Sequence, residues 1–171
     1  MPTTRLLRFT LMLGMLALAA CGFQMRGIAD LAFENLYIQG KHLSIIKPLK
    51  KSLAVNGVTV VDNEDRADLV MEVLNEGSEK RILSLSGTGL VREFDLYYRV
   101  SFRLKDAGAE TWGEVQTVEG RRDFSYNDNE LLAKQGEEQR LYDDMKADAI
   151  REIMRRLVVQ KPHKRTAATE K

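Results

Sequence analysis

The sequence predicts an α+β protein, in which two helices pack on one face of a four-stranded, mostly antiparallel sheet in the order β-α-β-β-β-α. Two observations carry this prediction. Residues 91–105 alternate apolar and polar side chains, which is typical of a strand with one buried and one solvated face. Residues 142–157 repeat apolar side chains at helical spacing, which indicates a long amphipathic helix that covers the sheet.

The first predicted elements are a strand and a helix. The segment AFENLYIQG, residues 32–40, is a short strand candidate. In residues 43–58, apolar side chains recur at helical spacing, Pro48 fits only near a first turn, and Asn56-Gly57 is a helix stop. The apolar positions of this helix are Ile46, Leu49 and Leu53. The segment VTVV is expected to lead into the next strand after the polar turn NEDRAD.

The next three strands are predicted to form a meander. Apolar side chains alternate from Leu69 to Val73 and again at Leu83 and Leu85, so we expect one long bent strand with a bulge at the Gly77-Ser78 interruption. The segment SGTG then forms a hairpin turn before the strand at 91–105. After the turn DAGAE, a third long strand is expected within 111–126.

The last predicted element is a long helix that begins in the segment NDNE, where Asp128 or Asn129 can cap the backbone amides. Its apolar stripe is expected to pack on the sheet. The stripe consists of Tyr142, Met145, Ala149, Ile153 and Leu157, with Ile150 and Met154 beside it.

The N-terminal segment is typical of a lipoprotein signal peptide. Arg5 and Arg8 form a cationic start, and the uncharged stretch that follows is shorter than the roughly 20 apolar residues of a membrane-spanning helix. It ends in LAAC, which resembles a lipobox, so we expect cleavage after residue 20 and acylation of Cys21. Gly22, rather than an aspartate, follows the cysteine, which resembles the sorting signal of outer-membrane lipoproteins in Gram-negative bacteria. The alternative is an ordinary signal peptide whose cleavage happens to leave a cysteine.

Composition predicts one folded domain and no bulk polycation. Cleavage after residue 20 leaves 24 basic and 25 acidic residues, a formal net charge of −1, so an anionic partner must meet a local basic patch and nucleic acid is not an expected partner. We expect a signal peptide at 1–20, one α+β domain at 21–160 and a flexible tail at 161–171, which has no apolar periodicity after Pro162.

The sequence offers no catalytic constellation, metal site or cofactor motif. His42 and His163 have no Cys or His partner at ligand spacing, and Cys21 is used by the lipid. The consecutive acids Glu137-Glu138 and Asp143-Asp144 point apart on a helix and are expected on its wet face. We therefore predict a protein that is not an enzyme and that acts by anchoring and binding.

Four segments in order resemble the LptE family of lipopolysaccharide-assembly lipoproteins, and the similarity runs from Cys21 to about Leu157. They are CGFQMRG, SLAVNGVTVV, ILSLSGTGLVREFDLYYRVSFRL and LLAKQGEEQRLYDDMKADAIREIMRRL. The resemblance implies a lipid-anchored protein of the Gram-negative outer membrane. Its members plug the LptD β-barrel from the periplasmic side, assist its assembly and bind lipopolysaccharide during delivery to the outer leaflet.

The resemblance also implies where lipopolysaccharide binds. The expected contacts are basic residues near the tip of the central hairpin and a lysine at the start of the last helix. Lys134 matches the lysine at the helix start. The chain has LSLSG before the turn, where some relatives place an arginine, so the nearest basic candidate is Arg92 after the turn. Arg121-Arg122 either adds charge at a strand end or forms a solvated edge.

Two other functions remain open. An accessory lipoprotein of another outer-membrane machine, such as a secretin pilot or a barrel-assembly subunit, would share the signal, the anchor and a small α+β domain. A tether to peptidoglycan is suggested only by the terminal Lys171, and such tethers resemble long heptad helices rather than mixed domains.

Overall fold

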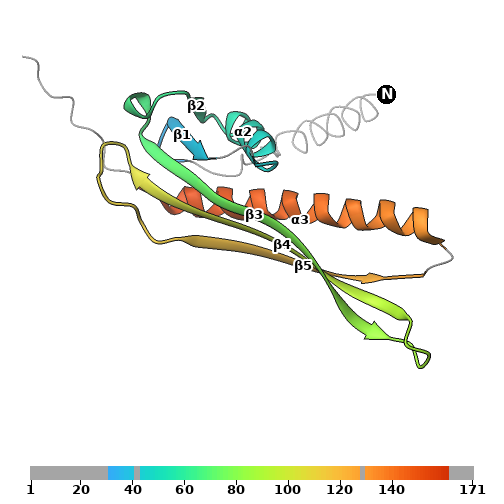
Figure 1. Cartoon of the computed structure of the whole chain (residues 1–171). Helices are drawn as coiled ribbons and strands as arrows, with labels where there is room; N and C mark the ends of the chain where they lie inside the picture. The colour runs from blue at the N-terminus through green and yellow to red at the C-terminus, as the bar shows by residue number, and fades with distance from the viewer. Residues whose placement is uncertain (1–30, 41–42, 128–129, 162–171) are drawn as a thin grey trace, which may run out of the picture.

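The computed structural model describes residues 31–40, 43–127 and 130–161 (Figure 1). The elements in order are β1 (Asn35–Gly40), α2 (Ile46–Val55), β2 (Thr59–Val61), the short 3-10 helix η1 (Glu64–Arg66), β3 (Leu69–Leu85), β4 (Val91–Asp106), β5 (Gln116–Ser125) and α3 (Leu131–Val159). Several predicted features lie outside the described residues: the signal peptide, nearly all of the tail, and Cys21, His42, Asp128, Asn129, His163 and Lys171.

The predicted α+β class is confirmed, but the prediction of four mostly antiparallel strands is wrong. The sheet has five strands in the order β2-β1-β3-β4-β5, and β1 pairs in parallel with both of its neighbours. The segment VTVV, expected to lead into the second predicted strand, forms an edge strand of its own, β2. Because α2 reverses the chain after β1, β2 returns parallel to β1, and only β3, β4 and β5 form the predicted antiparallel meander.

The first helix begins and ends where local chemistry predicts. Pro48 lies in the first turn of α2, and Gly57, with φ of +81°, follows the C-cap residue Asn56. The start of α2 has no side-chain cap of its own. Instead, the carboxylate of Glu76 on β3 accepts a hydrogen bond from the Ile45 amide at 3.1 Å, so the helix start is fixed by the sheet.

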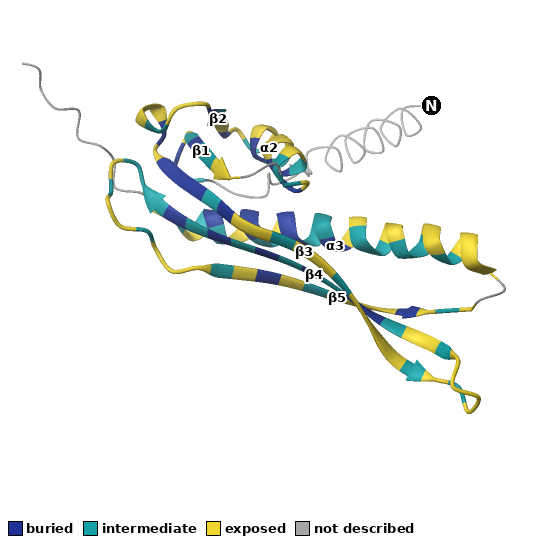
Figure 2. Cartoon of the chain, viewed as in Figure 1, coloured by how far each residue is buried: buried dark blue, intermediate teal, exposed yellow. Residues whose placement is uncertain are grey.

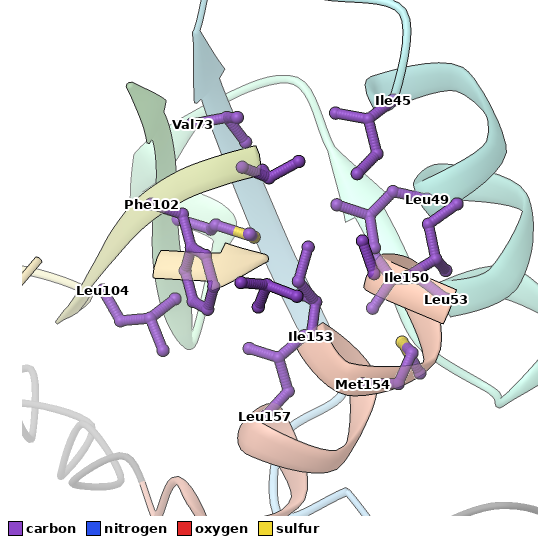
Figure 3. Close-up of a cluster of buried hydrophobic side chains, with 14 of the residues drawn as sticks. Ile45, Leu49, Leu53, Val73, Phe102, Leu104, Ile150, Ile153, Met154 and Leu157 are labelled. Carbon is purple, nitrogen blue, oxygen red and sulfur yellow. The ribbon is translucent and has the colours of Figure 1, made fainter. Parts of the chain in front are cut away.

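The core lies between the sheet and the two helices (Figures 1 and 3). The predicted inward face of β4 is confirmed, since Leu96, Tyr98, Val100, Phe102 and Leu104 are buried. The helices contribute Leu49 and Leu53 from α2 and Met145, Ala149, Ile150, Ile153, Met154 and Leu157 from α3 to the same cluster. Close approach is needed at Gly120 of β5, because a Cβ there would lie 3.2 Å from Cγ of Met145.

The bulge in β3 lies at Leu74 and not at Gly77-Ser78 as predicted. Val73 pairs with Phe102 and Asn75 pairs with Ser101, so Leu74 is an extra residue, whereas Gly77 and Ser78 pair regularly with Arg99 and Tyr98. An extra residue reverses which side chains face the helices. Odd-numbered residues up to Val73 face inward, and even-numbered residues from Glu76 to Ile82 do so afterwards.

The long helix α3 has two different halves (Figure 2). All of its buried residues lie from Met145 onward, so the predicted apolar stripe packs on the sheet only over the C-terminal half. The N-terminal half is held by polar contacts, of which one is a 3.0 Å hydrogen bond from the Tyr142 hydroxyl to the carbonyl of Glu79. None of the helices in the described part of the chain has the length and apolar character that crossing a membrane requires.

Candidate functional site: cations and aromatic rings at the hairpin end

A lysine on β3 is surrounded by three aromatic rings on the helix side of the sheet. The Nζ atom of Lys80 lies 4.2 Å from the ring centroid of Phe94, 5.3 Å from that of Phe124 and 5.5 Å from that of Tyr126. The same Nζ atom lies 2.6 Å from a carboxylate oxygen of Glu138 on α3. The lysine is thus stabilised by cation–π contacts and one ion pair, and it joins β3 to the N-terminal half of α3.

Lys134 joins the same group from the helix. Its Nζ atom donates to the Ser125 hydroxyl at 3.1 Å, lies 2.9 Å from a carboxylate oxygen of Glu137 and stands 5.6 Å from the Phe124 ring. Only 14% of its side chain is exposed. We name Lys80, Phe94, Phe124, Tyr126 and Lys134 the cation–aromatic cluster. Its ammonium groups sit beside carboxylates that an anionic ligand has to displace or share.

Arg92 lies next to this cluster but is not tied into it. Glu93 pairs with Ser84 and Val91 pairs with Leu85, so Arg92 is an extra residue of β4 in a further bulge, close to the hairpin turn. Its carbonyl accepts a hydrogen bond from the Tyr126 amide at 2.7 Å, which places it beside the cluster. Its side chain is exposed and forms no ion pair with any residue that the structure describes. Bulges often occur next to binding sites, where they redirect a side chain.

An open hollow of about 950 Å³ lies at this end of the molecule. Its lining includes Arg92, Thr88, Leu90 and residues 125–127, so it extends from the hairpin turn to the end of β5, where Lys134 binds Ser125. Aliphatic side chains are exposed at the same end of the molecule (Figure 2). They are Ile82, Leu83, Leu85 and Leu90 on the hairpin and Leu131 and Leu132 at the start of α3. Cationic, aromatic and aliphatic groups therefore occur together here.

A second polar group lies further along the same face, at Glu76. Its carboxylate accepts hydrogen bonds from the Ser44 hydroxyl at 2.5 Å and the Tyr98 hydroxyl at 2.6 Å, and lies 3.8 Å from Nζ of Lys146. Burial raises the pKa of Glu76, but the hydrogen bonds from Ser44, Tyr98 and the Ile45 amide and the charge of Lys146 outweigh it, so the pKa is lowered overall. This carboxylate ties α2, β4 and α3 to β3.

The opposite face of the sheet carries ion pairs between neighbouring strands. Arg99 bridges Glu79 on β3, at 2.9 Å, and Glu119 on β5. The guanidinium carbons of Arg81 and Arg99 each stand 5.0 Å from the Tyr97 ring centroid, and that of Arg121 stands 5.8 Å away. Hydrogen bonds from Arg81 and Arg99 lower the pKa of Glu79. No described helix covers this polar face.

One residue of that face departs from the expected alternation. Asp95 was predicted on the wet face of β4, yet it is buried, because Arg121 donates two hydrogen bonds to its carboxylate at 2.9 and 2.8 Å. Arg122, which follows Arg121 in the chain, pairs with Asp148 on α3 at 2.5 Å. The adjacent arginines Arg121 and Arg122 are therefore both paired within the fold.

The helix carboxylates that sequence analysis set aside act as partners of the cations. Glu137 pairs with Lys134 and Glu138 pairs with Lys80, whereas Asp143 accepts a hydrogen bond from Gln139. Among the described residues, no three His, Cys, Asp or Glu side chains come together in a way that could hold a metal ion.

Sequence analysis missed Lys80, and the bulge explains why. The sequence analysis expected a bulge at Gly77-Ser78 and inward-facing side chains at Leu83 and Leu85. It therefore assigned Lys80 to no site. The extra residue is Leu74, so Lys80 pairs with the inward-facing Leu96. Glu76, which also faces inward for this reason, was missed in the same way.

Comparison with known proteins gives one matching family. The model of the LptE family, described as lipopolysaccharide-assembly, matches residues 34–157. The LPS-assembly lipoprotein LptE of Photorhabdus laumondii is 27% identical over 173 residues, covering 98% of this chain and 93% of the relative. That of Yersinia enterocolitica is 25% identical over 160 residues, covering 91% and 76%.

Solved structures share the fold. Lipoprotein B from Nitrosomonas europaea superposes with a TM-score of 0.71 and 36% identity, covering 80% of this chain and 90% of that one. The rare lipoprotein B from Shewanella oneidensis superposes with a TM-score of 0.65 and 26% identity, covering 72% and 93%.

Proposed function

The chain belongs to the LptE family of lipopolysaccharide-assembly lipoproteins, and from that premise we propose that it binds lipopolysaccharide at its hairpin end while it plugs the LptD barrel of the outer membrane. It has no catalytic step in this role. It presents a lipid-binding end and a polar surface within a larger machine, and it is held at the membrane by an acylated Cys21.

The observation that carries the lipid part of the proposal is the chemistry of the hairpin end. Lipopolysaccharide is amphiphilic, with phosphate groups beside hydrocarbon chains. The exposed Arg92 and the ammonium groups of Lys80 and Lys134 suit phosphates, because charged donors form the stronger hydrogen bonds. The exposed aliphatic side chains of the hairpin and of the start of α3 suit hydrocarbon.

The polar face of the sheet supports the plug part of the proposal. Its ion pairs across β3, β4 and β5 give a continuous charged surface that suits the water-filled interior of a barrel and does not suit lipid. The half-buried Tyr97 and the three arginines around its ring lie near the centre of this face. Aromatic and arginine side chains are the types that interfaces favour.

Lipopolysaccharide binding by paired arginine variants tests the lipid site. Arg92→Gln removes one exposed cation from the hairpin end, and Arg66→Gln removes one exposed cation from the opposite end as a matched control. Loss of a charge-assisted contact costs about 1 kcal/mol, or about fivefold in affinity, so Arg92→Gln weakens binding by that amount and Arg66→Gln does not. Arg92→Gln combined with Lys134→Gln is expected to weaken binding by roughly tenfold or more, and the difference from the parent shrinks at high salt.

Co-purification with LptD and thermal unfolding accompany each variant. We expect every variant to remain folded and to co-purify with the barrel, because neither change touches the polar face. Equal lipid affinity of the parent and the double variant at low salt rules out this site. Absence of the barrel from every preparation, including the parent, instead supports the alternative function, an accessory lipoprotein of another outer-membrane machine.

A further inference from the structure

The exposed face of α2 carries three lysines and no acid. Lys47, Lys50 and Lys51 are exposed, and the helix contains no Asp or Glu. At 100° per residue the three lysines fall within an arc of about 100°, in which Lys47 and Lys51 lie opposite the buried Leu49 and Leu53 and Lys50 lies at the flank. We call Lys47, Lys50 and Lys51 the lysine face.

The lysine face differs from most other basic residues of the fold. Within β3, β4 and β5 every lysine and arginine except Arg92 forms an ion pair with a described residue, and within α3 all but Arg140 do. None of the three lysines of α2 forms such a pair within the described residues. Three like charges at neighbouring helix positions repel one another, so this arrangement favours an anionic surface outside the domain.

The lysine face lies near the place where the described chain begins. The end of α2 leads directly to Thr59, whose amide donates to the carbonyl of Glu34 at 2.8 Å, so the helix ends beside the residues that precede β1. Leu31 is the tenth residue after Cys21, and an extended segment of about ten residues spans at most about 35 Å. An anchor at Cys21 therefore keeps α2 within reach of the membrane surface.

We propose that the lysine face of α2 rests on anionic phospholipid headgroups of the leaflet that holds the lipid anchor. The proposal rests on the proposed acylation of Cys21. Each lysine close to an anionic membrane contributes on the order of 1 kcal/mol, and the tether supplies a high effective concentration of headgroups. The anchor holds the protein at the membrane, and the lysine face orients the domain on it.

A single thiol label on the full acylated protein reports this contact. Val55 is 80% exposed on α2, and because Cys21 is the only cysteine and its thiol is acylated, Val55→Cys provides one reactive thiol. The labelled protein is reconstituted through its anchor into phosphatidylcholine vesicles with or without phosphatidylglycerol, each containing a headgroup-attached quencher. We expect stronger quenching with phosphatidylglycerol and its loss at high salt.

Two triple variants separate the lysine face from overall charge. The first triple variant carries Lys47→Gln, Lys50→Gln and Lys51→Gln, and we expect it to abolish the response to phosphatidylglycerol. Each lysine removed lowers the ratio of molecules with α2 on the membrane to molecules with α2 off it by about fivefold. Arg140→Gln, Arg151→Gln and Arg155→Gln on α3 remove the same charge and leave the response intact. Equal quenching in both vesicle types, or equal loss in both triple variants, overturns the proposal.

Further arms distinguish the sources of failure. The mass of the N-terminal peptide tests acylation directly. An unmodified Cys21 removes attachment to all vesicles, which contradicts the anchor and with it this proposal, but leaves the lipopolysaccharide test of the hairpin end unaffected. Vesicles that contain lipopolysaccharide and no anionic phospholipid are expected to give a weaker response than phosphatidylglycerol vesicles. An equal response shows that the lysine face does not select phospholipid and overturns that choice of partner.

Discussion

At the scale of single residues, Glu76 links three other elements to β3 on the helix side of the sheet. Its side chain is 9% exposed and accepts hydrogen bonds from α2 and β4 while facing Lys146 of α3. Because its pKa is lowered in the folded protein, its stabilising effect is complete above the pKa of an ordinary glutamate and is lost as pH falls through the lowered value. The stability of the domain should therefore decline in the acid range, below about pH 4.5.

We predict that Glu76→Gln lowers the free energy of unfolding at pH 7 by about 1–3 kcal/mol, since hydrogen bonds to a charged group are lost from a mostly buried site. The variant also loses less stability than the parent as the pH falls from 5 to the lowest pH at which the parent stays folded. Urea unfolding at several pH values measures both effects. Glu119→Gln, in an exposed pair on the other face, is the control and costs at most about 1 kcal/mol. A Glu76→Gln curve parallel to that of the parent at all pH values contradicts the assignment.

At the scale of elements, the sequence predicted what periodicity encodes. The inward face of β4 and the apolar stripe of α3 were predicted correctly because each pattern repeats over several turns or pleats, and the start and stop of α2 were predicted from the local chemistry of Pro48 and Asn56-Gly57. The three-residue strand β2 is too short to show a period, and the bulge at Leu74 leaves no glycine or proline as a signal. Arg92 and Lys134 were chosen from family resemblance, but Lys80, which the bulge turns inward, could not be found by counting alternate residues.

Deleting single residues of β3 tests where the bulge lies. Removal of Leu74 leaves Val73 opposite Phe102 and Asn75 opposite Ser101, so the ladder becomes regular from Leu69 to Ile82, and Glu76 and Lys80 keep their partners. Removal of Ser78 shifts every later residue by one and turns Glu79 and Arg81 toward the helix. We expect the first deletion to cost about 1–3 kcal/mol and the second to prevent cooperative folding.

Thermal unfolding followed by circular dichroism compares the two deletions. A folded protein without Ser78 and an unfolded one without Leu74 would show that the extra residue is at Gly77-Ser78, as periodicity alone suggested. Crosslinking between residues 80 and 138 then reports whether the hairpin still meets α3.

At the scale of the whole molecule, the fold has a proximal end and a hairpin end with different support. The core cluster combines β1, α2 and the C-terminal half of α3 over the first residues of β3. Beyond Val73, β3 pairs with β4 alone, because its pairing with β1 ends there. A strand of 17 residues at about 3.3 Å per residue carries the hairpin turn roughly 50 Å from the proximal end. The proposed anchor and lysine face lie proximally, and the proposed lipid site lies distally.

The one-sided pairing of β3 beyond Val73 has a consequence for local opening. Amide hydrogens of the hairpin end and of α3 before Met145 are expected to exchange with solvent at least about tenfold faster than those of β3 from Leu69 to Val73, since few buried side chains resist their separation. Peptide-resolved hydrogen exchange measures this gradient, and uniform protection along β3 would contradict it. Lipopolysaccharide that binds at the hairpin end should slow exchange there and leave the proximal half unchanged. The affinity of that end for lipid then includes the entropic cost of ordering the segment that binds it, and mutations that stiffen the hairpin should tighten binding without adding any contact.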